Sequence, residues 1–571
     1  MNFFTENDDL VTTFDKLIPW DTLVPITHGA DVDVTDTVAT WREMLVAAGE
    51  YIGTEIAGRA KEIDEIGVIR DGGRVETSAP MEANLKGLAE LGFVGLSLPE
   101  DLSGSGMPFT ISSIGVGMIA RACPATMVDF GIGYTEPAAM ILRFGTDEQK
   151  RSYIPRLVRG DIKGAVAMTE PQAGSDVGNV QTSAVQGPDG CWRLVGRKQF
   201  ISAGNGDFVI VLARCVAGSK GLDGLGLFIV DREGDNYIVE RAEHKFTIRG
   251  STTCSLVFEG SKAQLLGDVG GGWREILTFM NESRIAIGIQ GLGIAEAAYA
   301  AASKYASERV QMGKPIREHP MIAEMLLDME TTIAGLRALA IEATLLQDEV
   351  AKTKNERSER KLRELTPLGK RYGAEDVIRV CRNALQIYGG YGVVTEYEVE
   401  RHMRNALILP IYEGTSQIQS LMAVRDLMRV ILRNPASLVR GGPTPMLAKT
   451  RVAGDFAVAR ATLVGALRGM IATMARKGGL DLVRGRRQPT EEETAPFLLH
   501  AERITETLAH LHVARALGEQ ALRLPERKRL AERAGRRAKL VAARNAAAMG
   551  AGDGGVFERI DEWSRERATA R

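Results

Sequence analysis

The period of the hydrophobic residues changes twice along this 571-residue chain, and this limits the possible folds more than any other feature. Helical spacing holds from about residue 40 to 160, and short β-rich runs replace it from Gly164 to about Gly272. Helical spacing then returns, most clearly in one apolar stripe at steps of four and three residues: Ile322, Leu326, Met329, Ile333, Leu336 and Ala340. We therefore expect helical, β and helical domains in that order.

The β-rich part contains a hairpin signal. Residues 183–185 and 191–195 flank the turn sequence Gly187-Pro188-Asp189-Gly190. Further β-rich runs follow at 208–212, 225–230 and 255–258. These short, regularly interrupted runs indicate a separate β domain of the barrel or sandwich type.

The predicted fold is α+β, because helical and β-rich parts follow one another along the chain. It is multidomain, because the chain is too long for one core. We predict six parts: an N-terminal extension (1–40), a helical N-terminal domain (41–163), a β domain (164–274), a four-helix bundle (275–433), a Pro/Gly-rich linker (434–446) and an extra helical C-terminal domain (447–571).

Composition excludes several classes of protein. The net charge of −2 argues against a dedicated nucleic-acid or membrane-surface protein. The five cysteines have no paired short spacing, so we expect neither a metal site nor a disulfide framework. The acidic N-terminus lacks the pattern of a signal peptide, and no run of eighteen uninterrupted apolar residues predicts a transmembrane segment. A cytoplasmic protein is expected.

The segment Tyr412-Glu413-Gly414-Thr415-Ser416 places one carboxylate just before an apolar helical run. Glycine beside a glutamate lets a ligand approach closely, and Thr or Ser can cap the next helix or bind a phosphate. The structural alternative is an exposed acid stabilised by the helix dipole.

Several other segments match the same enzyme family as the segment that contains Glu413. They are Met168-Thr169-Glu170-Pro171, Ala173-Gly174-Ser175-Asp176, Phe200-Ile201-Ser202, Ile248-Arg249-Gly250-Ser251, residues 309–316 and residues 386–392. In this order, over about residues 40 to 432, the chain resembles the acyl-CoA dehydrogenase family. The resemblance implies FAD as cofactor and an acyl-CoA thioester as substrate.

In the family, the residue that matches Glu413 is the catalytic base. The resemblance implies that Glu413 removes the α-proton while the β-hydrogen passes as hydride to flavin N5, which gives a trans-2-enoyl-CoA. Such a step needs a positioned base and a polarised carbonyl. Some members use a base just before the arginine that corresponds to Arg284; that residue is Ser283 here, and Glu282 would point away, which counts against an alternative base.

The resemblance also assigns residues to the two ligands, FAD and acyl-CoA. The residues that match FAD contacts are Met168, Thr169, Ser175, Phe200, Ser202, Arg309, Gln311, His319, Gln386, Gly389, Gly390, Thr415 and Gln417. Those that match substrate-side positions are Ser175, Asn281, Arg284 and Gly414. In the family, the residues that match Arg309, Gln311 and the 386–390 loop reach the FAD of a neighbouring subunit, so the resemblance implies a homo-oligomer, and we expect a dimer.

The chain departs from the common pattern at Phe200 and Ser202 (usually Trp and Thr), at Met312 (usually Phe) and at Asn405 (usually Asp). These departures and the extra C-terminal domain resemble a longer bacterial branch that includes 3-methylmercaptopropionyl-CoA dehydrogenases. The resemblance implies an electron-transferring flavoprotein as acceptor, and a straight-chain saturated acyl-CoA is the expected substrate.

Two other functions remain open. Nine of the residues from Arg523 to Arg544 are Lys or Arg, which fits either a solvated helix face or the basic region of the related DNA-binding alkylation-response flavoproteins. Salt-sensitive DNA binding would support that alternative. An acyl-CoA oxidase, which passes electrons to oxygen, is the other alternative, and peroxide formed during turnover would support it.

Overall fold

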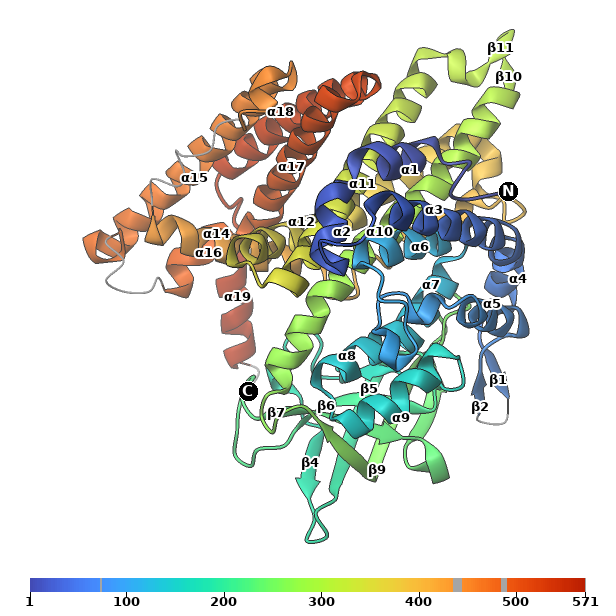
Figure 1. Cartoon of the computed structure of the whole chain (residues 1–571). Helices are drawn as coiled ribbons and strands as arrows, with labels where there is room; N and C mark the ends of the chain where they lie inside the picture. Colours follow the sequence, from blue (N-terminus) through green and yellow to red (C-terminus); the bar gives the residue numbers. More distant parts are fainter. Residues whose placement is uncertain (72–73, 435–443, 484–489, 570–571) are drawn as a thin grey trace.

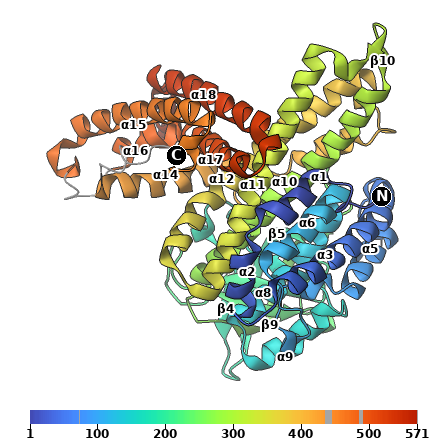
Figure 2. The ribbon, with the colours of Figure 1, turned by 45° about the horizontal axis from the view of Figure 1, so that its top comes forward.

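The computed structural model describes residues 1–71, 74–434, 444–483 and 490–569. A β domain lies at one end of the molecule, and a long helical bundle runs from it to the β10–β11 hairpin at the other end (Figure 1). The extra C-terminal helices α15, α17 and α18 pack beside the bundle (Figure 2). The predicted order of helical, β and helical parts is confirmed.

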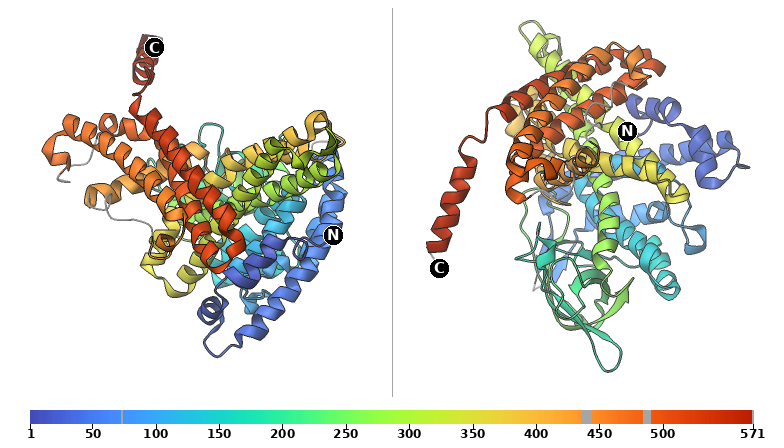
Figure 3. Two further views of the ribbon diagram at one scale, coloured as in Figure 1. Left: turned by 90° about the horizontal axis from the view of Figure 1, so that it is seen from above. Right: turned by 90° about the vertical axis from the view of Figure 1, so that its left-hand side faces the viewer.

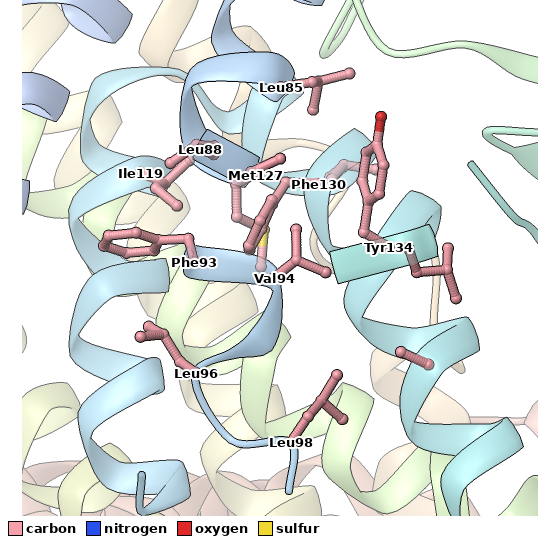
Figure 4. Close-up of a cluster of buried hydrophobic side chains, with 14 of the residues drawn as sticks. Leu85, Leu88, Phe93, Val94, Leu96, Leu98, Ile119, Met127, Phe130 and Tyr134 are labelled. Atoms are coloured by element: carbon pink, nitrogen blue, oxygen red, sulfur yellow. The ribbon is translucent and has the colours of Figure 1, made fainter. Parts of the chain in front are cut away.

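The predicted helical N-terminal domain is confirmed, and the extension before it, for which no structure was predicted, is helical as well. Its elements are α1 (Asp8–Thr12), α2 (Trp20–His28), α3 (Val34–Tyr51), α4 (Ala57–Ile66), α5 (Ala79–Glu90), α6 (Phe109–Ala122), α7 (Pro124–Phe130), α8 (Glu136–Phe144) and α9 (Asp147–Val158). A small antiparallel pair, β1 (Ile69–Asp71) and β2 (Arg74–Glu76), was not predicted, because three-residue strands leave no readable period. Figure 4 shows part of the apolar core between these helices, with Leu85, Ile119 and Phe130 in contact range of one cluster.

The β domain closes on itself. Its strands are β3 (Val166–Ala167), β4 (Ser183–Gln186), β5 (Trp192–Ser202), β6 (Phe208–Arg214), β7 (Leu225–Asp231), β8 (Ile238–Ala242) and β9 (Thr253–Leu266). The strand order is β3-β6-β4-β5-β9-β7, and β6 also pairs with β7, which closes a ring. The predicted hairpin is β4–β5, with Ser183 opposite Val195. This closed sheet confirms the barrel-like prediction.

The bundle consists of α10 (Gly272–Glu308), α11 (Pro320–Thr353), α12 (Glu356–Tyr388), α13 (Val399–Ala406) and α14 (Ser416–Arg433). The short hairpin β10 (Val310–Gln311) and β11 (Lys314–Pro315) joins the first two. In the predicted apolar stripe of α11, Met329, Ile333 and Leu336 are buried in the bundle core. Helix α12 begins ten residues before the predicted start near Thr366, because the Asn355 side chain caps it.

The C-terminal helices are α15 (Val452–Val483), α16 (Glu491–Leu499), α17 (Ala501–Arg523), α18 (Lys528–Gly550) and α19 (Val556–Thr569). Most of the predicted linker, residues 435–443, lies outside the described residues. Helix α19 projects away from the other helices (Figure 3), and no residue of it is buried.

Two described helices are long and apolar enough to cross a membrane by length and composition. One is α10, whose apolar window is 72% buried inside the protein, as in the core helix of a bundle. The other is Val452–Arg476 in α15, whose window is 28% buried.

The basic helix α18 is held by acids of neighbouring helices. Arg533 and Arg537 form ion pairs with Glu324 and Asp328 on α11. In all, six of the nine basic residues between 523 and 544 have such partners: Arg527, Arg529, Arg533, Arg537, Lys539 and Arg544. The pairs of Arg529, Arg533 and Arg537 join α18 to α11 of the bundle, and the other three pairs lead to α1, α15 and α17.

The N-terminal extension is part of the same packing. Asp9 on α1 forms ion pairs with Arg337 on α11 and Arg527 next to α18. Both arginines are almost completely buried, at 2% and 4% exposed. One carboxylate thus joins the two ends of the chain to the bundle.

Candidate active site

Glu413 lies in a tight turn between α13 and α14. Glu413 and Gly414 both adopt left-handed backbone conformations, with φ of 54° and 81°. Few residues other than glycine adopt φ above zero, so this glutamate is held in its conformation by its surroundings. A Cβ on Gly414 would lie 2.6 Å from the Gln419 amide nitrogen, so the turn requires glycine there.

Lys370 on α12 holds this turn in place by hydrogen bonds. Its ammonium donates hydrogen bonds to the carbonyl oxygens of Leu409 and Gly414, each at 2.8 Å. Burial lowers the pKa of Lys370 to about 8, although the Glu413 carboxylate favours its charged form. After the turn, the Thr415 hydroxyl caps α14 by accepting from the Ile418 N–H at 3.2 Å. The predicted helix cap by a Thr or Ser hydroxyl is thus present, directly after Glu413.

The carboxyl group of Glu413 faces α10. Burial raises its pKa above the ordinary value, while the charges of Arg284 and Lys370 and the Ser283 hydroxyl act in the opposite direction. Arg284 is 3% exposed, and its Nη1 donates to the Asn281 Oδ1 at 3.0 Å. Glu413, Asn281, Arg284 and Gly414, all predicted around the substrate, thus lie at one place where α10 meets the turn.

Glu282 does not take part in this cluster. Its Oε1 accepts from Arg143 at 2.6 Å and from the Gln347 side chain at 2.6 Å. The Oγ of the neighbouring Ser283 instead lies 2.9 Å from Glu136 Oε1. Glu282 is therefore held by hydrogen bonds from α8 and α11, and it also lines the cavity described below.

Sequence reasoning missed two groups beside Glu413, namely Glu136 and Lys370. Glu136 begins α8, directly after a π-helical turn at Gly131–Thr135. Burial, followed by the Glu413 charge, raises the pKa of Glu136 to about 8. A single carboxylate in the otherwise apolar run from Gly131 to Met140 is the signal that could have found it.

A cavity of about 500 Å³ adjoins this cluster between α6, α8, α10 and the loop before α6. Glu136 and Ser283 lie in its wall, and Thr27 of the N-terminal extension also lines it. Most of the lining is apolar, and six of its residues are labelled in Figure 4: Phe93, Val94, Leu96, Leu98, Met127 and Phe130. A pocket of this size and polarity suits an apolar ligand of moderate length.

The predicted flavin-side residues lie on the β domain. Phe200 has a φ of 61° and is 59% exposed, although it lies within β5. The Met168 and Thr169 carbonyls accept from the Lys198 ammonium and the Gln199 N–H, both at 2.9 Å, which fixes this segment on β5. Ser202 ends β5, and Ser175 lies exposed in the loop after β3.

Glu170, the acidic residue of the Thr169-Glu170-Pro171 motif, has a structural role. Its carboxylate accepts from Lys198 at 2.8 Å and from the N–H groups of Gln181 and Thr182 at 2.8 and 3.0 Å. This carboxylate therefore ties the loop after β3 to β5. It supports the Met168–Thr169 segment without facing a ligand site.

A second predicted cluster lies at the far end of the bundle. Arg309 and Gln311 are exposed at the β10–β11 hairpin, and the His319 ring nitrogen lies 3.1 Å from the Gln311 carbonyl oxygen. Gln386 follows Lys370 by sixteen residues on α12, about 24 Å along the helix axis. Figure 1 shows the hairpin remote from the β domain. One chain therefore does not bring the two clusters together.

The residues of both clusters fit FAD by their chemistry. A Cβ added at Gly389 or Gly390 would meet no atom within 4 Å, so the backbone there is open to close approach. A guanidinium such as Arg309 suits a diphosphate, and the exposed Phe200 ring offers an apolar face for a flavin. Gln417 is placed differently, because its amide donates to Glu502 Oε1 on α17 at 2.9 Å.

Comparison with known proteins identifies the architecture. Three family models match: acyl-CoA dehydrogenase N-terminal domain over residues 40–161, middle domain over 165–261 and C-terminal domain over 270–428. Acryloyl-CoA reductase (NADH) from Anaerotignum propionicum is 36% identical over 68% of this chain and 94% of its own length.

One relative and one solved structure match the chain beyond the bundle. The 3-methylmercaptopropionyl-CoA dehydrogenase from Ruegeria pomeroyi is 30% identical over 81% of this chain and 84% of its own length. An acyl-CoA dehydrogenase structure with FAD from Bacillus anthracis covers 94% of this chain and 91% of its own, with a TM-score of 0.75 and 23% identity. The latter shares the fold, including the region beyond the bundle.

Proposed function

This chain belongs to the acyl-CoA dehydrogenase family and is an FAD-dependent oxidoreductase that acts on acyl-CoA, and we propose that Glu413 is its catalytic base. The observation that carries the proposal is the cluster of Glu413, Arg284, Lys370 and Ser283 beside an apolar cavity. A half-buried carboxylate of raised pKa, near two cations that keep it ionised, has the properties of a general base.

In the proposed reaction, Glu413 takes the α-proton of the bound thioester. When bound, FAD supplies the two-electron acceptor that receives the β-hydrogen as hydride. The Glu413 N–H is the chain's own donor for the thioester carbonyl, and the left-handed turn and Lys370 hold this backbone in place. Met168, Thr169, Phe200 and Ser202 would hold the flavin ring against the β domain.

We propose that the 500 Å³ cavity receives the acyl chain and that the substrate is a straight-chain saturated acyl-CoA. The cavity wall is mainly aromatic and aliphatic, which favours a hydrocarbon chain through the hydrophobic effect.

The test is anaerobic mixing of the purified holoenzyme with acyl-CoAs of increasing length, while flavin absorbance is followed. We expect one chain-length class to bleach the flavin, and Glu413→Gln to slow bleaching by at least about 100-fold. Glu90→Gln, an exposed glutamate of α5, is the matched control. Bleaching by Glu413→Gln at the wild-type rate would exclude Glu413 as the base.

We also propose a homodimer in which Arg309, Gln311, His319 and the 386–390 loop bind the partner's FAD. The distance between the two clusters along α12 supports this. Co-expression of Arg309→Ala and Glu413→Gln chains with different tags tests it. The mixed dimer should regain one active site, whereas contacts within one chain would leave it inactive.

An electron-transferring flavoprotein in the cytoplasm is the proposed acceptor. Among the relatives, one is a caffeyl-CoA reductase–Etf complex subunit from Acetobacterium woodii, 34% identical to this chain. Reduced enzyme should transfer electrons to such a flavoprotein faster than to oxygen. Stoichiometric peroxide in aerobic turnover would instead favour an oxidase. DNA binding is disfavoured, because acids of the same chain already pair with the basic residues of α18.

A further inference from the structure

Glu136 is a second carboxyl group at the site, and the reaction described above leaves it without a role. It comes from α8, whereas Ser283 comes from α10 and Glu413 from the turn before α14. The Ser283 Oγ lies 2.9 Å from Glu136 Oε1, and the same hydroxyl is near enough to Glu413 to act against the burial that raises the pKa of that carboxyl group. Ser283 thus stands between the two acids, in the wall of the acyl cavity.

A hydroxyl has one hydrogen to donate, so Ser283 cannot donate to both carboxylates at once. If Glu136 is protonated, its O–H donates to Ser283 Oγ, and the Ser283 O–H is free to donate to Glu413. If both acids are ionised, one loses its donor and two like charges face each other. The geometry therefore favours a state in which one of the two carboxyl groups is protonated and the other is ionised.

The surrounding charges decide which acid is ionised. Arg284 and Lys370 both face Glu413. Glu136 faces Glu413 and Glu282, and the nearest cation on its own helix, Arg143, is already paired with Glu282 at 2.6 Å. Both cations that face this site therefore favour an ionised Glu413, and both neighbouring acids favour a neutral Glu136. The pKa of about 8 for Glu136 agrees with this order.

We propose that Glu136 is a positioning residue, which in its neutral form holds the Ser283 hydroxyl toward Glu413 and so fixes the base for proton abstraction. The proposal rests on Glu413 as the base. No proton leaves Glu136 during the reaction; its O–H only sets the direction of the Ser283 hydrogen bond. Ionisation of Glu136 at alkaline pH reverses that direction and removes the donor from Glu413.

The experiment compares wild type, Glu136→Gln, Glu136→Leu and Ser283→Ala by anaerobic single-turnover flavin reduction from pH 6 to 10, the range around the pKa of about 8. In wild type, the rate should fall above about pH 8. The glutamine amide still donates to Ser283 but cannot ionise, so Glu136→Gln should lose this alkaline fall. Glu136→Leu and Ser283→Ala should lower the rate at neutral pH about tenfold, the effect of one lost hydrogen bond, with substrate affinity largely kept.

Infrared spectroscopy of the substrate-free holoenzyme supplies a readout independent of turnover. Wild type should show a protonated-carboxyl C=O band that disappears as the pH rises through about 8, and Glu136→Gln should lack it. Glu90→Gln should match wild type in both measurements.

Three results would overturn the proposal. An alkaline fall that persists in Glu136→Gln would belong to Lys370, whose pKa is also about 8. A wild-type rate in Ser283→Ala would show that the hydroxyl does not position the base. Absence of the infrared band would show that Glu136 is ionised. If Glu413→Gln still bleached the flavin, the base assignment itself would fail, and this result is distinct from the other three.

Discussion

The buried ion pair between Lys198 and Glu170 gives a sharp test of how the flavin-side wall is held. The two charged atoms lie 2.8 Å apart, and the side chains are 0% and 2% exposed. Glu170→Gln leaves the Lys198 charge buried without a carboxylate to balance it, although the Met168 carbonyl still accepts from its ammonium. Breaking a buried pair from one side costs about 3–5 kcal/mol of unfolding free energy.

Removing both charges should cost less than removing one. In Lys198→Met combined with Glu170→Gln no buried charge remains, and the glutamine oxygen can still accept from one of the Gln181 and Thr182 N–H groups. We expect this double variant to recover about 2 kcal/mol relative to Glu170→Gln alone. As control, Glu90→Gln breaks the exposed Lys86–Glu90 pair, which should cost at most about 1 kcal/mol.

The assay is guanidinium unfolding of the holoenzyme and its variants, followed by tryptophan fluorescence, with the midpoint and slope fitted together. A cost below about 1 kcal/mol for Glu170→Gln would refute the reasoning, since an unpaired buried charge cannot be that cheap. A double variant less stable than the single one would refute it as well.

The pH dependence of this pair has a fixed sign. Burial alone would raise the pKa of Glu170, but the Lys198 charge and the hydrogen bonds outweigh it and hold the pKa below the ordinary 4.5. The stabilisation is therefore fully present above pH 4.5 and is lost as the pH falls through the folded-state pKa. The stability difference between wild type and Glu170→Gln should shrink correspondingly in acid.

Three further predictions concern packing and the cofactor. Phe200→Gly relieves a left-handed backbone, which costs about 1–3 kcal/mol, so the FAD-free protein should melt higher while FAD titration shows weaker binding. Asp9→Ala leaves Arg337 and Arg527 buried without this carboxylate, and we expect a loss of about 3 kcal/mol with faster proteolytic release of the C-terminal helices. Gly414→Ala should slow flavin reduction, because its Cβ would lie 2.6 Å from the Gln419 amide; an unchanged rate would show that the turn tolerates a side chain.

Much of the fold was predictable because it depends on local pattern. The change from helical to β spacing and back gave the order of the domains, and the Gly187–Gly190 turn gave the β4–β5 hairpin. The order of the short motifs identified the family. The small β1–β2 pair and the first turns of α12 were missed, since neither has a long enough apolar period.

The sequence by itself determined the domain order and singled out Glu413, because hydrophobic period and motif order are properties of neighbouring residues. Only the tertiary structure decided what surrounds that carboxylate. Glu136 precedes Ser283 by 147 residues and reaches it because α8 packs against α10. Likewise, the basic run of α18 could be read as a nucleic-acid site until folding placed it against the acids of α11. Charges interact through space, so a linear pattern fixes their number but not their partners.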